Sequence, residues 1–285
     1  MNKVAVVTDS TACIPDELLK GYPIHCIPLQ VIWGEDTYRD GIDITSEEFY
    51  TRLKTTDILP STSQPSPAAF EHIYRRLLDE GFDIISIHIS SKLSGTCDSA
   101  IQAKENIKSD RIIMIDSLTS GMALGFEALE IARAAHNGSN LKDCVMLANK
   151  TVKNTGVLFA VKTLDFLHRG GRIGGASAFL GTALGLKPIL EVKEGKIEAI
   201  GKIRTMAKAM DRVIDIMVER VGNRRPLRIS TLHANAPLEA EQLLQKTCER
   251  FNPRDIAEAF SSGLSPVVGT HTGPGTVGLT YMAGI

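Results

Sequence analysis

Short runs of branched apolar residues, each followed by a helical pattern, limit the fold of this chain more than any other feature. Three such runs, rich in Val and Ile, lie at residues 4–7, 84–89 and 112–115. Runs of this kind that alternate with helices are typical of parallel strands buried on both faces. Capping residues mark helices at 15–21, from 45 onward and at 66–81. The first half of the sequence therefore predicts an α/β domain built on a parallel sheet.

The pattern changes near residue 155, and a second α/β module is predicted from there to the C-terminus. Its expected elements are a strand at 157–161, a glycine-rich turn and small-residue helix at 170–186, a hairpin at 188–203 turning at Glu194 and Gly195, a helix at 206–221, a strand at 227–233, a helix at 238–251, and glycine- and threonine-rich strands after that. We therefore expect two domains, residues 1–155 and 156–285, the second with a mixed sheet.

Charge is distributed unevenly along the chain, although the formal net charge is only −1. Residues 1–150 carry 14 Lys and Arg against 21 Asp and Glu, a net charge of −7, and residues 151–285 carry 18 against 12, a net charge of +6. An overall charge near zero gives no general attraction to nucleic acid, so we expect no such partner. The basic half is either ordinary solvated surface or a face that meets a phosphate or an acidic partner.

The five cysteines are scattered and odd in number, and none forms a CxxC pair. This pattern favours reduced thiols in a cytoplasmic protein over a disulfide framework or a zinc site. No run approaches the roughly 18 apolar residues of a membrane-spanning helix, and the N-terminal apolar run is too short for a signal peptide. Residues 259–285 carry no charge but contain glycines and prolines, so we expect buried strands and turns there.

Hydroxyl residues gather where the predicted strands end. One cluster follows each of the three strands, at residues 8–11, 90–96 and 116–120, and a fourth at residues 61–66 precedes a helix. Because ligands bind beyond the carboxyl ends of parallel strands, these clusters could together hold a carboxylate or phosphate. Neutral donors bind an anion without neutralising it, so the anion remains able to react. The alternative is that each cluster only caps a helix.

Three residues of the second half stand out for their charge or chemistry. His271 lies between two threonines in the uncharged segment, and it is either a site residue or a buried structural histidine. Arg172 lies among glycines and Arg204 follows the hairpin; for both we favour contact with an anion or a partner over solvated surface charge. Residues 273–278 match GxGxxG, but too few residues follow for the helix of a dinucleotide site.

Eight segments in a fixed order are more specific than any single motif. They are TDST (8–11), STSQPS (61–66), SKLSGT (91–96), DS (116–117), GGRIG (170–174), KPIL (187–190), KIRT (202–205) and HTGPG (271–275). With these segments the sequence resembles the DegV family of bacterial fatty-acid-binding proteins over essentially its whole length. One departure is Cys97, which stands where an aromatic residue is usual in the family.

The resemblance implies a two-domain fold of the DegV type, with a tunnel for one long-chain fatty acid between the domains. It places the carboxylate on Thr62 and Ser94, with Ser63 and His271 beside them. The bound fatty acid is the ligand, and no metal or other cofactor is implied. The tunnel walls could include Phe159, Phe166, Phe179 and Leu184, and the alternative for all four is that they belong to the ordinary core.

The resemblance also implies that the protein is a carrier and not itself an enzyme. A separate ATP-dependent fatty-acid kinase subunit would phosphorylate the bound carboxylate to an acyl phosphate for phospholipid synthesis. Arg172 and Arg204 would contact that kinase or the new phosphate. A transient contact with a membrane surface is compatible with such a carrier.

Two other functions remain open from the sequence. A lipid sensor or transport module would bind the same ligand without a kinase. A stand-alone serine-dependent hydrolase would use Ser94 or His271, but the chain lacks a GxSxG elbow and a base at a recognisable spacing. The sequence predicts neither the preferred chain length and saturation nor the oligomeric state.

Overall fold

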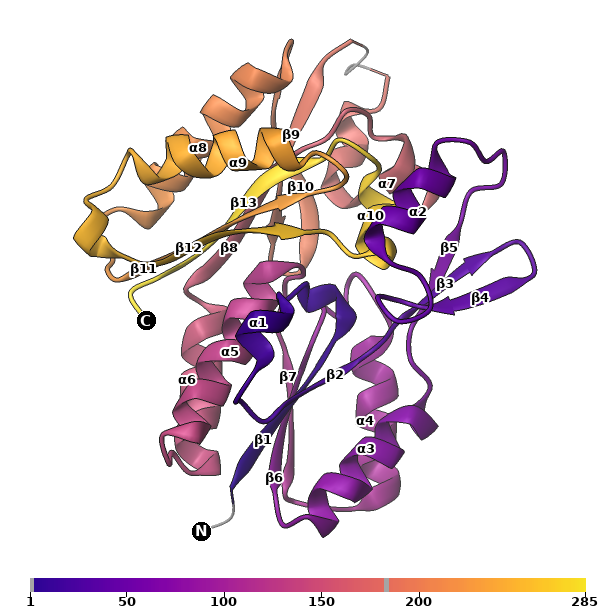
Figure 1. The fold of residues 1–285 in the computed structure, drawn as a ribbon, viewed down its shortest axis with the longest axis vertical. Coiled ribbons are helices and arrows are strands. Elements are labelled where there is room, and N and C mark those ends of the chain that lie inside the picture. The colour runs from indigo at the N-terminus through magenta and orange to yellow at the C-terminus, as the bar shows by residue number, and fades with distance from the viewer. Residues whose placement is uncertain (1–2, 182–184) are drawn as a thin grey trace.

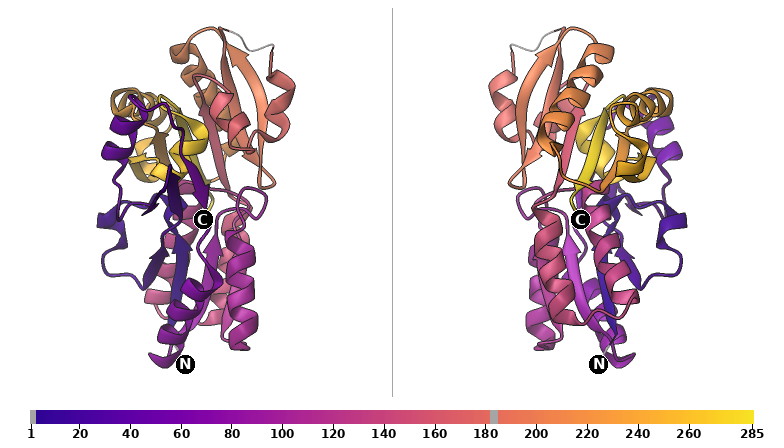
Figure 2. Two further views of the ribbon diagram at one scale, coloured as in Figure 1. Left: turned by 90° about the vertical axis from the view of Figure 1, so that its right-hand side faces the viewer. Right: turned by 90° about the vertical axis from the view of Figure 1, so that its left-hand side faces the viewer.

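The computed structural model describes residues 3–181 and 185–285. Two parts are stacked on one another, a parallel sheet with its helices in one and a larger mixed sheet in the other (Figures 1 and 2). The last residues of the chain lie at the level where the two parts meet (Figure 2). The predicted fold class, a parallel-sheet part followed by a mixed-sheet α/β part, is confirmed.

The first part contains a four-stranded parallel sheet in the order β2-β1-β6-β7. Its strands are β1 (Val4–Asp9), β2 (Ile24–Ile27), β6 (Asp83–His88) and β7 (Ile112–Asp116). Three of them coincide with the predicted apolar runs. The sequence IHCI of β2 has too few apolar residues for a recognisable run, so only its pairing with β1 makes it a strand.

Alternate residues of β1 pack into separate cores on the two faces of this sheet. The covering helices are α3 (Pro67–Asp79), α4 (Thr96–Ile107), α5 (Met122–His136) and α6 (Leu141–Val152). Ala5 and Val7 pack with α3 and α4, whereas Val4 and Val6 pack with α5 and α6. A strand covered on both sides needs apolar residues at every position, which explains the unbroken Val and Ile runs.

The second part contains a six-stranded mixed sheet in the order β10-β9-β8-β13-β11-β12. Its strands are β8 (Thr155–Ala160), β9 (Lys187–Lys193), β10 (Lys196–Ile203), β11 (Leu227–His233), β12 (Ile256–Gly263) and β13 (Val277–Ala283). Only β11 and β12 run parallel, and the other neighbours are antiparallel. The predicted hairpin turn at Glu194 and Gly195 is confirmed between β9 and β10.

Two helices, α8 (Met206–Val221) and α9 (Pro237–Cys248), cover the side of this sheet that faces away from the parallel sheet (Figure 1). Residues on the opposite face, among them Phe159 and Leu232, share a core with Trp33 and Phe49 from the first part of the chain. The two parts are therefore joined by apolar packing and not only by a linker.

An excursion of the chain between β2 and α3 provides those shared residues. It contains β3 (Gln30–Trp33), β4 (Asp36–Arg39), α2 (Ser46–Leu53) and β5 (Ser61–Ser63). The strands form a separate sheet in the order β4-β3-β5, which Figure 1 shows at one side of the molecule. The capping box of Thr45 and Glu48 begins α2 as predicted. The three short strands are not predicted, because polar residues dominate β4 and β5.

Two segments of the second part differ from the prediction. The small-residue helix expected within 170–186 is not found in the described part of that range, 170–181 and 185–186: α7 (Asp165–Arg169) ends before it, and it contains only the 3-10 helix η2 (Gly174–Phe179). Repeated glycines make a longer helix there unfavourable. The uncharged C-terminal segment is not only strands and turns, because it also contains α10 (Pro266–Thr272). The remaining short helices are η1 (Ser10–Ala12), α1 (Asp16–Leu19) and η3 (Pro253–Asp255).

The strands of the six-stranded sheet all follow Thr155, next to the predicted boundary. The division into domains 1–155 and 156–285 itself stays a prediction, because the excursion packs on both parts. Among the helices of residues 3–181 and 185–285, none is both long and apolar enough to cross a bilayer.

Candidate functional site

A cavity lies between the carboxyl edge of the parallel sheet and the inner face of the six-stranded sheet. Its apolar lining comes from both parts of the chain: Ile89, Leu93, Val157, Phe159, Leu167, Val192, Ile197, Leu232, Leu264 and Val268. Its polar lining consists of Thr62, Ser94, Ser120, Arg172, His271 and Thr272. Among the described residues, no aspartate or glutamate lines it. The cavity therefore suits a mainly apolar molecule with one anionic end.

The cavity is small for the number of residues that line it. It admits the centres of water-sized molecules over only about 80 Å³, although 17 residues line it. One wall is formed by β8, β9, β10 and β11, whose paired backbones hold its shape. The cavity is therefore small and mainly apolar, with one wall held by paired strands.

Thr62 and His271 form a hydrogen-bonded pair at one polar region of the cavity. Thr62 Oγ1 lies 2.8 Å from His271 Nε2, which joins the middle of β5 to the last turn of α10. Burial, and then the nearby Arg172 charge, lower the pKa of His271 from 6.5 to about 4. The imidazole is therefore neutral near pH 7, with one donor and one acceptor nitrogen.

The second ring nitrogen of His271 has no partner among the described residues. Nδ1 is buried and makes no hydrogen bond. It lies against Gly170, where a Cβ atom would come within 2.1 Å of it. Only glycine therefore leaves room for the imidazole, and the unpaired nitrogen marks the site as incomplete without a ligand or water.

Arg172 is held at the cavity by two backbone carbonyls. Its Nε donates to Leu93 O at 3.0 Å, and its Nη1 donates to Gly170 O at 2.6 Å. The guanidinium thus ties the segment after α7 to the segment that carries Ser94. It also borders a second pocket, together with Arg169, Phe166, Thr62 and His271. This second pocket is therefore basic, and no described aspartate or glutamate lines it.

Ser94 reaches the cavity from the loop between β6 and α4. Its Oγ lies 2.9 Å from Thr96 Oγ1, and Gly95 at the N-terminus of α4 has no side-chain cap. Gln64, two residues after Thr62, lies against Gly95, where an added Cβ atom would come within 3.0 Å of Gln64 Nε2. The loop carrying Thr62 and the loop carrying Ser94 therefore meet, and the adjacent helix N-terminus favours an anion there.

The other hydroxyl clusters mostly serve the fold, as the capping alternative states. Asp9 accepts from Thr11 N and Thr11 Oγ1, and it also binds His88 Nδ1 and Ile89 N. Asp116 accepts from the backbone N–H groups of Ser91 and Leu118. The expectation that four clusters converge is therefore wrong for residues 8–11, which do not line the cavity: Asp9 bonds to Thr11, His88 and Ile89, and Ser10 bonds to Asp40 and Leu29.

Other predicted site residues lie at different distances from this cavity. Phe159 lines it, and Phe166 lines the adjoining basic pocket. Ser63 lines neither pocket, because it follows Thr62 on β5 and neighbouring residues of a strand point to opposite sides. Its Oγ donates to Gln64 O at 3.3 Å. Phe179 is half-buried beneath Lys202, whose Nζ lies 5.2 Å from the ring centre. Leu184 falls outside the described residues.

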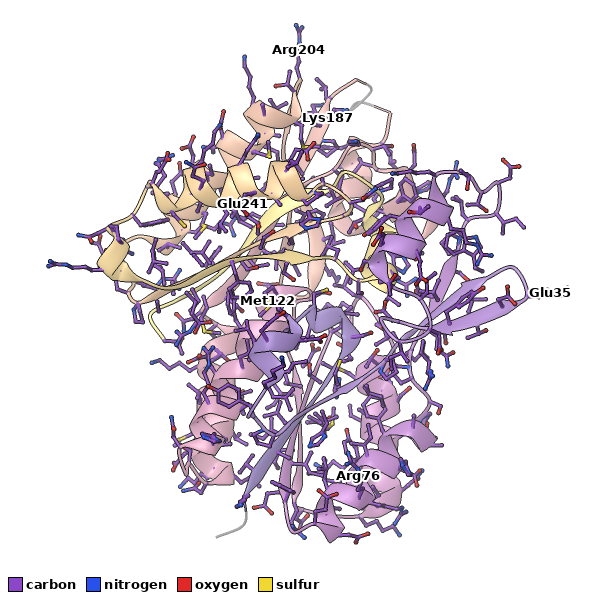
Figure 3. All side chains as sticks on the ribbon, viewed as in Figure 1. Glu35, Arg76, Met122, Lys187, Arg204 and Glu241 are labelled. Atoms are coloured by element: carbon purple, nitrogen blue, oxygen red, sulfur yellow. The ribbon has the colours of Figure 1, made fainter. Side chains whose placement is uncertain are left out.

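Arg204 lines neither the cavity nor the second pocket. It is exposed after β10 and points into solvent at the end of the molecule opposite the parallel sheet (Figure 3). Arg172 and Arg204, grouped in the sequence analysis by charge, therefore cannot act on the same atoms.

Several lining residues are not found from the sequence, notably Ser120, Thr272, Val268 and Leu264. Ser120 Oγ is buried without a partner in the described structure, although it belongs to a predicted hydroxyl cluster. A signal for α10 was present: Ser265 caps it and Pro266 is its first residue, the same arrangement that begins α3. The described residues contain no group of three or more His, Cys, Asp or Glu that could hold a metal ion.

Comparison with known proteins gives full-length similarities. The family described as "Uncharacterised protein, DegV family" matches residues 3–284. A DegV domain-containing protein of Halalkalibacterium halodurans is 36% identical over 282 residues, with 99% of each chain covered. A fatty-acid-binding DegV family protein from Thermus thermophilus superposes with a TM-score of 0.93 at 34% identity, covering 99% of both chains. DegV from Bacillus subtilis, named a fatty acid binding protein, gives a TM-score of 0.88 at 36% identity, covering 99% of this chain and all of that chain.

Proposed function

The chain belongs to the DegV family, and on that premise we propose that it is a carrier that binds one long-chain fatty acid in its cavity. Solved relatives in the family are named fatty acid binding proteins. The observation that carries the proposal is the cavity lining, which is mostly apolar and otherwise consists of hydroxyls, an imidazole and a guanidinium, with no described acid. A molecule with a long apolar part and one anionic end matches that combination.

The apolar wall accounts for the affinity of the proposed ligand. Each buried methylene contributes about 0.8 kcal/mol, so a C16 chain gains on the order of 10 kcal/mol as an upper limit. The polar end then needs only to orient the carboxylate. We assign this role to Thr62 and Ser94. His271 is bonded to Thr62, and Ser63 lies next to Thr62 on β5.

The tautomer of His271 determines whether the hydroxyl proton of Thr62 is free to donate to a ligand. Arg172 lowers the pKa of His271, so a ring N–H pointed toward that cation is disfavoured. Nδ1 lies against Gly170, whose carbonyl binds the guanidinium, so we assign the lone pair to Nδ1 and the proton to Nε2. Nε2–H then donates to Thr62 Oγ1, and the threonine proton is free to donate to a carboxylate. Thr96 can play the same part for Ser94.

We further propose that a separate ATP-dependent kinase subunit acts on the loaded carrier. A carboxylate oxygen would form a bond to the γ-phosphorus of ATP while the bond to the leaving ADP oxygen breaks, giving the acyl phosphate. A carboxylate held by neutral donors keeps its nucleophilic lone pairs, which supports this step. Arg172, beside the basic pocket, is suited to the new phosphate, and exposed Arg204 is suited to docking the kinase.

The same proposal places the carrier in the cytoplasm, with at most a transient contact at a membrane surface. All five cysteines are free thiols, which supports a reducing compartment. Phospholipid synthesis would consume the acyl phosphate.

The geometry counts against the serine hydrolase. Ser94 Oγ has Thr96 as its partner and not a base. His271 contacts a threonine hydroxyl, but its pKa of about 4 makes it a weak base, and no carboxylate orients Nδ1. A sensor or transport module without a kinase needs the same cavity and differs only in its partner.

Organic extraction of the purified protein, followed by mass spectrometry, tests the binding proposal. The expected result is one long-chain fatty acid per chain, restored to delipidated protein by palmitate. Recovery of no lipid, together with no palmitate binding by calorimetry, would overturn it. Acyl phosphate formation with added kinase and ATP separates the carrier from the sensor, and ester cleavage by the protein alone would favour the hydrolase.

A further inference from the structure

A buried carboxylate from the first part of the chain holds the N-terminus of α10. Asp40 is only 2% exposed. Its Oδ1 accepts the Val267 N–H at 3.2 Å, and its Oδ2 accepts the Ser10 Oγ–H at 2.6 Å. Val267 and Asp40 are 227 positions apart, so this contact exists only in the folded chain.

The backbone around Asp40 is itself fixed. Asp40 N donates to Leu29 O at 2.9 Å, and Ser10 Oγ accepts the Leu29 N–H at 3.1 Å. Asp40 also bridges to Ile44, with Gly41 between them at a φ of +74°. The carboxylate is therefore a fixed point between β1, the excursion and α10.

A second residue of the excursion fixes the next part of α10. Tyr50 lies so close to Gly269 that a Cβ atom there would come within 2.2 Å of Tyr50 Oη. Thr62 then contacts His271. Contacts from the excursion thus fall on residues 267, 269 and 271 in turn, and each comes from a different element.

We propose that Asp40 is a positioning residue, which holds α10 in the register that places His271 against Thr62 and the cavity. The inference rests on the proposed head-group site. Val267 and His271 are one helical turn apart, so a shift at the helix start is passed directly to the imidazole. A seven-residue helix makes few internal hydrogen bonds, and its position depends on tertiary contacts.

The proposal differs from a purely structural role in what it predicts for His271. If Asp40 only stabilised the fold, its removal would lower the melting temperature and leave the imidazole environment of the folded protein unchanged. If it positions α10, its removal lets water reach His271, and the pKa of the imidazole rises from about 4 toward its ordinary value of 6.5.

The test compares Asp40→Ala and Asp40→Asn with Asp43→Asn, a control three residues away whose exposed carboxylate pairs only with Arg39 in the described structure. The ring signals of His271, identified with a His271→Gln variant, are followed by NMR between pH 3.5 and 8. Palmitate affinity is measured in the same samples. We expect a raised His271 pKa and about 10-fold weaker binding in Asp40→Ala, a smaller change in Asp40→Asn, which keeps an acceptor for Val267 N–H, and none in Asp43→Asn.

Folded Asp40 variants with an unchanged His271 titration would overturn the proposal, whatever their palmitate affinity. Should Asp40→Ala not fold, Asp40→Asn and Ser10→Ala give the same readout with a milder change. Failure of the wild-type protein to bind palmitate would count against the proposed function instead, and the His271 titration would still decide the role of Asp40.

Discussion

Two histidines of this protein bond to a hydroxyl side chain, but their surroundings are opposite. His88 has both nitrogens paired, Nε2 with Ser86 Oγ at 2.6 Å and Nδ1 with Asp9 Oδ2 at 3.0 Å, and it is completely buried. Tyr74 Oη continues this chain at 2.6 Å from Ser86 Oγ. His271 pairs one nitrogen with Thr62, leaves the other unpaired and lines a cavity.

The comparison shows that the order of chemical groups does not identify a site. Asp9, His88 and Ser86 form an Asp-His-Ser chain like that of a hydrolase, yet no described cavity adjoins it and each polar group is satisfied within the fold. A satisfied buried network fixes a structure. The incomplete pair at His271 has donors left for a ligand, so it is the better candidate for function.

The largest expected effect is a loss of stability when the hydrogen-bonded network of Asp9, His88 and Ser86 is broken. Asp9→Ala leaves His88 Nδ1 and the N–H groups of Ile89 and Thr11 without their acceptor, so we expect the free energy of unfolding to fall by about 3–5 kcal/mol. Urea unfolding measures this, and Asp9→Asn, which retains an acceptor, is the matched control with a smaller loss. If the free energy of unfolding of Asp9→Ala falls by less than about 1 kcal/mol, the network does not have a structural role and the contrast between the two histidines is wrong.

Lowering the pH tests the second histidine, His271, through the stability of the protein. Because the folded pKa of His271 is about 4 and its unfolded value is 6.5, the unfolded chain binds more protons between these pH values. The stability contribution of neutral His271 is complete above pH 6.5 and is lost as pH falls toward 4. We expect wild type to lose about 2 kcal/mol more than His271→Gln across this window. Parallel stability–pH curves for the two proteins would contradict the assignment.

Head-group variants should affect binding and leave the fold intact. Thr62→Ala or Ser94→Ala removes one donor to the carboxylate, so palmitate affinity should fall about 10-fold, while methyl palmitate affinity changes little. Acyl phosphate formation should fall further, because the carboxylate loses its orientation. Ser63→Ala, on the same strand but turned away, is the control. Equal kinase-coupled activity in all three variants would sink the assigned site.

The arginines give the smallest expected effect on lipid binding. Arg172→Ala and Arg204→Ala should both retain palmitate and lower the rate of acyl phosphate formation with the kinase. Only Arg172→Ala should raise the pKa of His271, because burial and the charge of Arg172, not that of Arg204, lower it. Loss of palmitate from Arg172→Ala would instead show that its bonds to Leu93 O and Gly170 O support the pocket.

Three strands of the parallel sheet are predicted because they are unbroken apolar runs, and α3 and α2 are predicted because their caps are local signals. The strands β2 to β5 are not predicted, because each has only three or four residues, too few for a recognisable pattern, and they become strands by pairing with neighbours. The helix α10 is not predicted either, although Ser265 and Pro266 carry a local signal for its start.

The candidate site was predicted in two steps: local chemistry singled out His271, Arg172 and the hydroxyl clusters at 61–66 and 90–96, and the resemblance chose Thr62 and Ser94 within those clusters. Thr62, Ser94, His271 and Arg172 were singled out and all line the cavity, whereas Ser63 and Arg204 do not. Ser120 and Thr272 were not chosen because nothing in a hydroxyl residue's own sequence says which way it points.

By itself, the sequence determined where apolar runs, caps and hydroxyl clusters fall, and hence an α/β fold with a parallel sheet in its first half. These features depend on neighbours a few residues away. Only the tertiary structure decided which hydroxyls bond to other residues within the fold and which line the cavity. That distinction depends on contacts such as those from Asp9 to His88 and from Thr62 to His271, which join residues 79 and 209 positions apart.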